Sequence, residues 1–198
     1  QAIAEHSARF YGQTLDPDKE ITVTSGATEA IFCAGLAFIN PGDEVVVFQP
    51  CYDSYIPAIT FAGGIPVPVT LHWPGFRFDP DELRRAITPR TRAIIINTPH
   101  NPTGTLFSHQ ELMLIAELCC RHNLLAICDE VYEHITFGEA KHLRLGTYPG
   151  MHERTLTISS GGKSFSVTGW KIGWAIGPEW LQVGLRRVHQ FSVFATAT

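Results

Sequence analysis

Long apolar runs are missing from this 198-residue sequence. Its most apolar stretches, at positions 44–48 and 92–97, fall far short of the roughly 20 residues that a membrane-spanning helix needs. Positive charge is also scarce, because the formal net charge is −4 and no stretch concentrates Lys and Arg. A nucleic-acid binder normally carries such a basic surface. We therefore expect neither a membrane partner nor a nucleic-acid partner.

Cysteine and histidine are present, but not in the patterns of a metal site. The five cysteines include no C-x-x-C pair and the nine histidines include no H-E-x-x-H motif, so no metal site is expected. An odd number of cysteines in apolar or helical surroundings favours reduced core residues over a disulfide framework, which predicts a cytoplasmic protein. These cysteines are Cys33, Cys51, Cys119, Cys120 and Cys128.

Short β-branched runs alternate along the chain with longer segments of helical periodicity, and turns rich in Gly, Pro and Asn separate them. With 44% hydrophobic and 17% charged residues, the sequence is suited to one well-buried domain. Helices are predicted at 28–39 and 108–122, the second with Ser108 as its N-cap and Glu111 three residues later. The alternation predicts an α/β fold with a mostly parallel sheet covered on both faces. Strands are predicted at 21–25, 44–48, 64–69, 93–98, 124–128, 155–159 and 172–176.

Four polar loop segments each follow a predicted strand, and the carboxyl ends of parallel strands meet at one edge of a sheet. The first segment is S-G-A-T at 25–28. The backbone N–H groups of Gly26, Ala27 and Thr28, together with the Thr28 hydroxyl, could bind a phosphate at a helix N-terminus. Taken alone, this segment is equally well explained as an ordinary turn between a strand and a helix.

The next two loops add an amide and a carboxylate. The segment 97–104 contains two prolines that fix a loop able to present the Asn101 amide inward, although a proline-rich turn alone also explains it. Asp129 comes directly after the buried strand at 124–128, and Tyr132 follows closely. A carboxylate in that position must be solvated or paired.

The fourth loop, S-S-G-G-K-S at 159–164, contains Lys163, and Lys171 follows eight residues later. The chain has only four lysines, and a structural lysine more often extends from an amphipathic helix. The G-K-S end resembles a Walker A loop, but the first glycine of that motif would fall on Thr157, inside a predicted strand. A dinucleotide site has no support either, because no G-x-G-x-x-G follows a predicted strand.

Taken together, these motifs resemble those of the class I and II aminotransferases of pyridoxal-phosphate fold type I, within them the methionine, kynurenine and glutamine type. The resemblance rests on N-P-T-G at 101–104, D-E-V-Y at 129–132, S-G-G-K at 160–163 and T-G-W-K at 168–171. It implies a three-layer α/β/α large domain with the small domain largely absent. Positions 1–198 would then form a single domain that binds pyridoxal 5'-phosphate (PLP), truncated at both ends relative to the family.

The resemblance also implies roles for individual residues. Lys163 matches the lysine that forms the internal aldimine, a Schiff base with PLP, and later moves a proton at the substrate α-carbon. Asp129 matches the aspartate that pairs with the pyridine nitrogen of the cofactor. Asn101 and Tyr132 match the pair that hydrogen-bonds its phenolic oxygen, and Asn101 also faces the substrate. Tyr52 stands where the family places an aromatic ring against the cofactor, although a core tyrosine at a helix start would also explain it.

The phosphate of PLP would be bound by residues from two of the loops. A lysine there supplies a point charge where some relatives have arginine. Asn97 is placed near the same site. The phosphate-binding residues implied by the resemblance are Gly26, Ala27, Thr28, Ser160 and Lys171.

The implied activity is PLP-dependent transamination between an amino acid and a 2-oxo acid by a homodimer. Two alternatives stay open: another reaction on the same cofactor, such as a β-lyase acting on cysteine conjugates, and a non-catalytic phosphate-binding fragment. Family members are about twice as long, and the arginine that binds the substrate carboxylate comes from their small domain. Methionine, kynurenine, glutamine and aromatic amino acids all stay open as substrates. Among their users, the segments 50–55 and 129–134 look most like methionine- or kynurenine-using relatives.

Overall fold

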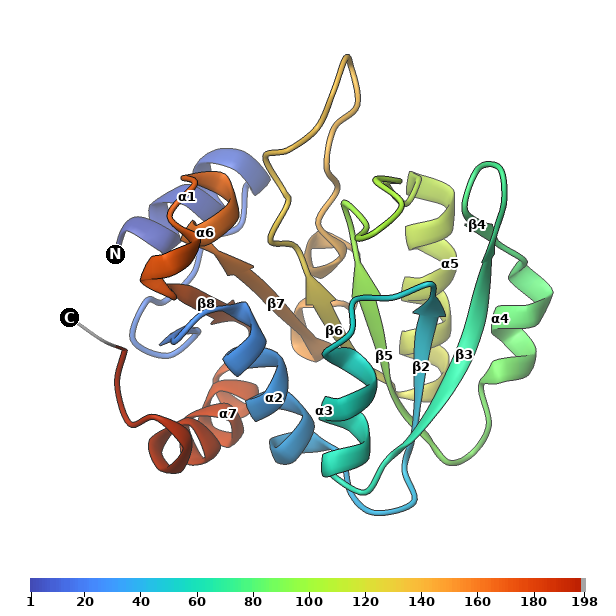
Figure 1. The fold of residues 1–198 in the computed structure, drawn as a ribbon, viewed down its shortest axis with the longest axis horizontal. Helices are drawn as coiled ribbons and strands as arrows, with labels where there is room; N and C mark the ends of the chain where they lie inside the picture. Colours follow the sequence, from blue (N-terminus) through green and yellow to red (C-terminus); the bar gives the residue numbers. More distant parts are fainter. Residues whose placement is uncertain (197–198) are drawn as a thin grey trace.

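Eight strands form one continuous sheet in the computed structural model, which describes residues 1–196 (Figure 1). The strand order across the sheet is β1-β8-β7-β6-β5-β2-β3-β4. The strands are β1 (Ile21–Thr24), β2 (Glu44–Gln49), β3 (Ile65–His72), β4 (Arg77–Phe78), β5 (Thr91–Asn97), β6 (Leu125–Asp129), β7 (Thr155–Ser160) and β8 (Gly173–Ile176).

The sheet is mostly parallel, as the sequence predicts. Strands β3, β2, β5, β6 and β7 pair in parallel. Strand β8 runs antiparallel to both β7 and β1, and β4 runs antiparallel to β3. Strand β8 lies between β1 and β7 and is antiparallel to both, so β1 and β7 point the same way. The carboxyl ends of β1, β5, β6 and β7 therefore lie at one edge of the sheet.

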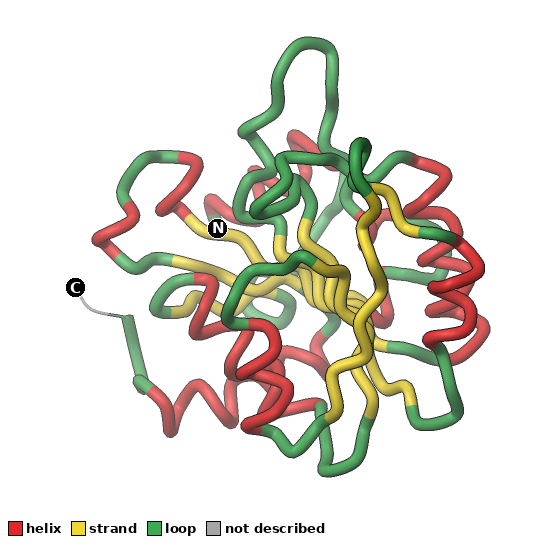
Figure 2. The backbone as a smooth tube through the Cα atoms, turned by 45° about the vertical axis from the view of Figure 1, so that its right-hand side comes forward, coloured by secondary structure: helices red, strands yellow, loops and turns green. Residues whose placement is uncertain are grey.

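Helices cover both faces of the sheet, so the predicted three-layer α/β/α architecture is confirmed (Figure 2). Helices α2, α3 and α7 pack on one face, while α4 and α5 pack on the other and α1 lies over β8. Within residues 1–196, every helix is too short or too polar to cross a lipid bilayer. The helices are α1 (Ala2–Tyr11), α2 (Ala27–Phe38), α3 (Tyr55–Phe61), α4 (Pro80–Ala86), α5 (His109–His122), α6 (Gly161–Ser164) and α7 (Glu179–Ser192). Three 3₁₀ turns are η1 (Leu145–Thr147), η2 (His152–Arg154) and η3 (Thr168–Trp170).

Strand β2 shows why the central strands are apolar throughout. Successive side chains of a strand point to opposite faces. Val45 and Val47 accordingly join the core under α2 and α3, whereas Val46 and Phe48 join the core under α4 and α5. Each residue of the strand meets a helix layer on one side or the other. An alternating polar pattern is therefore absent from β2, as expected for a strand buried on both faces.

Local signals account for the two helices that the sequence predicts. Helix α5 begins with the expected capping box, in which the Ser108 hydroxyl accepts the Glu111 N–H at 3.2 Å and the Glu111 carboxylate accepts the Ser108 N–H at 2.7 Å. It ends at Asn123, whose φ of 52° is left-handed. Helix α2 begins after Gly26, whose φ of 84° is a conformation that favours glycine.

Several elements were not predicted, for reasons that differ. Helix α3 lacks a side-chain cap and contains Pro57, so its seven residues carry no helix signal. Helix α4 was also missed, although it carries a helix start signal: the Asp79 carboxylate accepts the Asp81 N–H, and Pro80 occupies the first turn. The two-residue strand β4 is too short to show periodicity.

Close backbone packing next to the turn between β1 and α2 requires a glycine at position 173. An added Cβ on Gly173 would lie 2.4 Å from the Gly26 carbonyl carbon and 2.6 Å from the Ala27 nitrogen. Gly173→Ala should cost about 1–3 kcal/mol of folding free energy and lower Tm by about 3–10 °C. Thermal unfolding followed by circular dichroism measures this. Gly169→Ala is the matched control, since its Cβ would meet nothing within 4 Å; equal Tm values for the two variants would contradict the packing constraint.

Candidate functional site

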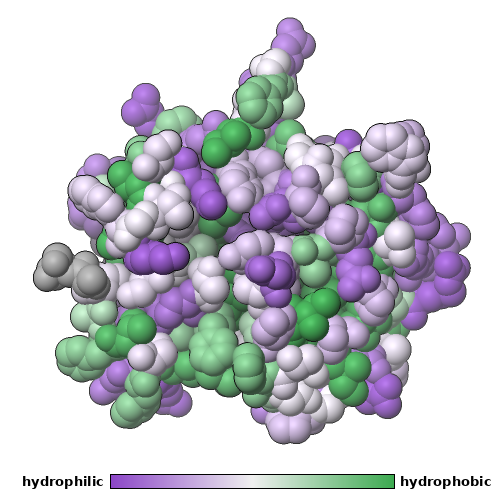
Figure 3. Space-filling model, in the orientation of Figure 1, coloured by the Kyte–Doolittle hydropathy of each residue, from purple (hydrophilic) through white to green (hydrophobic). Residues whose placement is uncertain are grey.

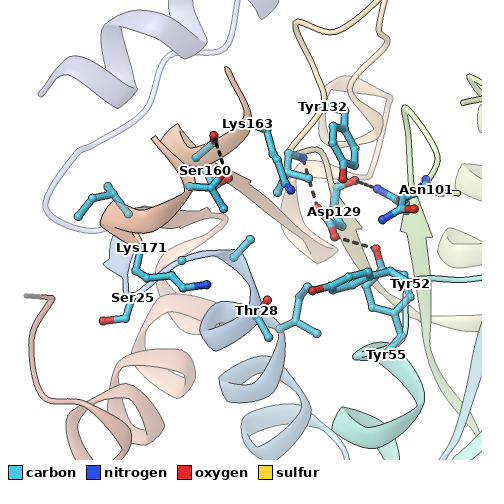
Figure 4. A pocket seen from close by; sticks show the side chains of 18 residues that line it. Ser25, Thr28, Tyr52, Tyr55, Asn101, Asp129, Tyr132, Ser160, Lys163 and Lys171 are labelled. Atoms are coloured by element: carbon cyan, nitrogen blue, oxygen red, sulfur yellow. Dashed lines mark hydrogen bonds between the residues drawn. The ribbon is translucent and has the colours of Figure 1, made fainter. Parts of the chain in front are cut away.

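One pocket lies at the sheet edge where β1, β5, β6 and β7 end (Figure 4). It encloses about 180 Å³, which is similar to the roughly 150 Å³ cavity known to hold a benzene ring. All ten residues predicted for the site line it: Gly26, Ala27, Thr28, Tyr52, Asn101, Asp129, Tyr132, Ser160, Lys163 and Lys171. The fold therefore brings the four loops together, while the role of each residue stays a prediction.

Asp129 ends β6 and lies at the base of the pocket with 4% of its surface exposed. The Tyr55 hydroxyl donates to its Oδ2 at 2.7 Å, and the Val131 N–H donates to its Oδ1 at 3.2 Å. Burial raises the pKa of Asp129 from its ordinary 3.8 to about 6, although both hydrogen bonds lower it. Within residues 1–196, no Lys, Arg or His nitrogen lies within 4.0 Å of this carboxylate. Asp129 is thus a buried acid with no cation in direct contact within the described residues, although the nearby charge of Lys163 also lowers its pKa.

The side chain of Asn97 connects two segments that line the pocket. Its Nδ2 donates to the Asp129 carbonyl at 2.9 Å, and its Oδ1 accepts the Asn101 N–H at 2.6 Å. Asn97 ends β5 and is 3% exposed, so these bonds form in the interior. The side chain of Asn97 therefore fixes the loop that carries Asn101 against the end of β6.

One side of the pocket is the first turn of α2, as predicted for a phosphate site. The Gly26 N–H donates to the Thr24 carbonyl at 2.8 Å and is therefore engaged, which differs from the predicted role of that amide. The Ala27 and Thr28 N–H groups belong to the first helical turn, where no carbonyl of the helix can accept them. Gly26 supplies the positive φ that turns the chain into the helix, and the two residues that follow line the pocket.

Lys171 and Ser160 lie on the same side of the pocket as this helix start (Figure 4). Lys171 adopts a left-handed φ of 53°, and its Cδ lies 3.9 Å from where a Cβ on Gly26 would be. Its aliphatic chain therefore runs beside Gly26 toward the pocket. An ammonium, a hydroxyl and two amides of a first helical turn around one corner are the groups that an anion such as a phosphate would require.

Lys163 extends into the pocket from the short helix α6, opposite Asp129 and beside Tyr132. Its Nζ lies 5.6 Å from the centre of the Tyr132 ring. Tyr52 borders the pocket as well, with its ring 5.7 Å from that of Tyr55 in an edge-to-face arrangement. Figure 4 shows the amine of Lys163 beside Tyr132 and Asp129.

Eight further residues line the pocket and were not among the ten predicted. Asn97 had been placed near the site by resemblance, and Tyr55 lies in the segment 50–55 that was considered only for substrate preference. No local signal marks Tyr55 as a partner of Asp129, since 74 positions separate the two. The eight residues are Ser25, Ile31, Tyr55, Asn97, Val131, Gly162, Thr168 and Ile172.

The residues present fit PLP. Its phosphate matches the anion site at the start of α2, and its protonated pyridine nitrogen matches a buried carboxylate that lacks a cation. Its aldehyde matches the amine of Lys163. The cofactor would thus be held by Ala27, Thr28 and Lys171 at one end and by Asp129 at the other.

Known proteins similar to this chain are aminotransferases. The family model described as aminotransferase class I and II matches residues 1–198. The chain is 52% identical over 193 residues to the probable N-succinyldiaminopimelate aminotransferase DapC of Mycobacterium tuberculosis, covering 96% of this chain and 49% of that protein. It is 44% identical over 200 residues to kynurenine–oxoglutarate transaminase 3 of Rattus norvegicus, covering 96% of this chain and 44% of that protein.

A solved structure supports the same relationship. An Escherichia coli protein whose crystal structure and reactivity identify a methionine aminotransferase function superposes with a TM-score of 0.96 at 42% identity. The match covers 98% of this chain and 52% of that one. The chain spans about half the length of the curated relatives it matches.

The raised pKa of Asp129 has a consequence for stability. Because the folded protein binds a proton on Asp129 more tightly than the unfolded chain does, folding stability falls as pH rises from about 4 to about 6. Asp129→Asn removes this titration, so the Tm of the variant minus that of the wild type should grow across this window and level off above it.

Thermal unfolding of cofactor-free protein near pH 4.5, 6 and 8 measures this difference. Asp81→Asn is the control, since the Asp81 side chain is 71% exposed. A difference that stays constant over the three pH values would contradict the assignment of a raised pKa to Asp129.

Proposed function

This chain belongs to the class I and II aminotransferase family, and from that premise we propose that it is the cofactor-binding large domain of an enzyme that transfers an amino group from an amino acid to a 2-oxo acid. The observation that carries the proposal is the convergence of Lys163 and Asp129 in one pocket beside an anion site. The family's cofactor is PLP, which when bound supplies an electron sink for the negative charge left at the substrate α-carbon.

Asp129 serves in this proposal as the counter-charge for the pyridine nitrogen. With that cation beside it, the carboxylate stays ionised in a site that otherwise favours its protonated form. The Tyr55 hydroxyl and the Val131 N–H hold both of its oxygens in place. Asp129 would therefore hold the proton on the ring nitrogen of bound PLP.

Lys163 is the proposed base that takes the proton from the substrate α-carbon and returns it during transfer. Its amine enters the pocket from α6, whose position is fixed by the Gly161 N–H donating to the Ile172 carbonyl at 3.1 Å. Only a neutral amine can accept a proton, so Lys163 must be uncharged at that step.

The remaining pocket residues bind and orient. The Tyr132 hydroxyl and the Asn101 amide are proposed to hydrogen-bond the phenolic oxygen of PLP, and Tyr52 to contact the ring face. Asn101 is proposed to contact the substrate as well. The residues proposed to bind the phosphate, which all lie at one corner of the pocket, are Ala27, Thr28, Ser160 and Lys171.

The assembly of the whole protein is proposed from its exposed apolar surface. Large apolar side chains near the pocket are open to solvent, including Phe165 at 69% and Trp170 at 73%. Phe61 on α3 is 74% exposed and packs on Phe32 of α2. Figure 3 shows apolar side chains over the lower part of the molecule, where Figure 1 places α2 and α3. Surfaces of this kind mark protein interfaces. We propose a homodimer, as the family resemblance implies.

The proposed compartment follows from the cysteines. All five thiols are free within the described residues, and three of them are buried. Unpaired buried thiols suit a reducing compartment such as the cytoplasm.

Covalent trapping tests the assignment of Lys163. Borohydride reduction of the protein with PLP should attach one cofactor to Lys163, because its amine is the one that faces Asp129 across the pocket. Peptide mapping by mass spectrometry locates the label. Lys19 and Lys141 are internal controls, since neither lines the pocket; a label on either of them in place of Lys163 would overturn the assignment.

The reaction itself is tested on the complete protein. We expect stoichiometric formation of a 2-oxo acid from the amino donor and an amino acid from 2-oxoglutarate, with methionine, kynurenine, glutamine, aromatic amino acids and N-succinyldiaminopimelate as donors. Lys163→Ala should lower kcat by about 10²–10⁴-fold, the range that general base catalysis typically contributes. Release of pyruvate and ammonia without any amino-group transfer would show a lyase instead.

A further inference from the structure

Beside the pocket, a fully buried arginine joins three segments of the chain. Arg144 lies just before η1 with its side chain 0% exposed, between Glu130 and Glu133, whose side chains are 0% and 1% exposed. Its Nε donates to Glu130 at 3.0 Å and its Nη2 donates to Glu133 at 2.9 Å. Its Nη1 donates to the Ser7 hydroxyl of α1 at 2.9 Å. No residue of this group lines the pocket.

The Glu133 carboxylate accepts three side-chain hydrogen bonds in this network. Besides Arg144, the Tyr11 hydroxyl of α1 donates to its Oε2 at 2.6 Å, and the Ser159 hydroxyl of β7 donates to its Oε1 at 2.6 Å. The Arg144 guanidinium also lies 3.6 Å from the centre of the Tyr11 ring. Both oxygens of the Glu133 carboxylate are therefore fixed from three directions, by a helix, a strand and the segment before η1.

Three residues of the network are direct sequence neighbours of residues that line the pocket. Glu133 directly follows Tyr132, Glu130 directly follows Asp129, and Ser159 directly precedes Ser160. The Glu133 N–H also donates to the Glu130 carbonyl at 2.9 Å, which closes a turn around Tyr132. A displacement of Glu133 would consequently move Tyr132, whereas Asp129 is held separately by Tyr55 and Asn97.

A buried ion pair adds little net stability to a fold, because the cost of desolvating the two charges offsets most of their attraction. What such a network does supply is a defined geometry, since an acid bonded by three donors has one position. In this network two carboxylates face one guanidinium, and the Nε2 of His142 lies 2.9 Å from a carboxylate oxygen of Glu130.

We propose that Glu133, held by Arg144, Tyr11 and Ser159, is a positioning residue that fixes the Tyr132 hydroxyl in the pocket. This inference rests on the proposed function, in which Tyr132 hydrogen-bonds the phenolic oxygen of PLP. Glu133 acts through Tyr132 and touches neither cofactor nor substrate.

Glu133→Gln in the complete, PLP-loaded protein tests this role. Loss of a well-placed donor to the phenolic oxygen destabilises its charged form, so the midpoint of the pH titration of the cofactor's visible absorbance should rise. We expect kcat to fall about tenfold, with KM for the amino acid changing less than about twofold, as a lost hydrogen bond in the transition state would produce. The spectral midpoint is a readout that a merely structural role would not move.

A double-mutant cycle separates action through Tyr132 from other effects. In a Tyr132→Phe background, Glu133→Gln should leave the midpoint unchanged, because the hydroxyl that it positions is already absent. Glu44→Gln is the matched control: Glu44 is 5% exposed and pairs with Arg90 at the start of β2, on the opposite edge of the sheet. That variant should lower Tm without moving the midpoint.

The outcomes are distinct. A Glu133→Gln protein with lowered Tm but an unmoved midpoint, kcat and KM overturns the inference, and so does an undiminished effect in the Tyr132→Phe background. If Glu133→Gln does not fold, Tyr11→Phe decides in its place, since it removes one donor to Glu133 while every charge stays, and a smaller shift in the same direction is expected. A wild-type protein that shows no cofactor absorbance would instead refute the proposed function.

Discussion

The buried carboxylate of Asp129 is the constraint on which the rest of the site depends. An ionised acid in the interior without a cation is unfavourable, and burial accordingly raises its pKa to about 6. The fold tolerates this cost because Tyr55 and the Val131 N–H supply two hydrogen bonds. A cationic ring nitrogen would supply the missing charge. The same carboxylate that destabilises the free protein thereby becomes a selective contact for the proposed cofactor.

The topology of the sheet brings the other groups to Asp129. Strands β5, β6 and β7 are parallel neighbours, so their carboxyl ends deliver Asn97, Asp129 and Ser160 to one edge. Strand β8 runs the other way and returns the chain to that edge at its beginning, just after Lys171. It also pairs with β1, which places the start of α2 beside Lys171. A helix N-terminus and a lysine far apart in sequence thus meet at one corner.

Much of the site could be predicted from sequence because its chemistry is marked by local motifs at strand ends. Asp129 follows an apolar strand, Lys163 follows a glycine pair, and the turn at Gly26 precedes a helix. The supporting contacts could not be predicted, since they join residues distant in sequence. Tyr55 lies 74 positions from Asp129, and Tyr11 lies 122 positions from Glu133. The short elements α3 and β4 were missed for a related reason, because packing rather than periodicity determines them.

The most direct test of Asp129 as the partner of the cofactor is the ¹⁵N chemical shift of the ring nitrogen in the complete protein loaded with ¹⁵N-labelled PLP. We expect a protonated nitrogen from about pH 6 to about pH 8 in the wild type, because the adjacent carboxylate stabilises the cation. In Asp129→Asn the nitrogen should be unprotonated over the same range. An unprotonated nitrogen in the wild type would contradict the central role of Asp129.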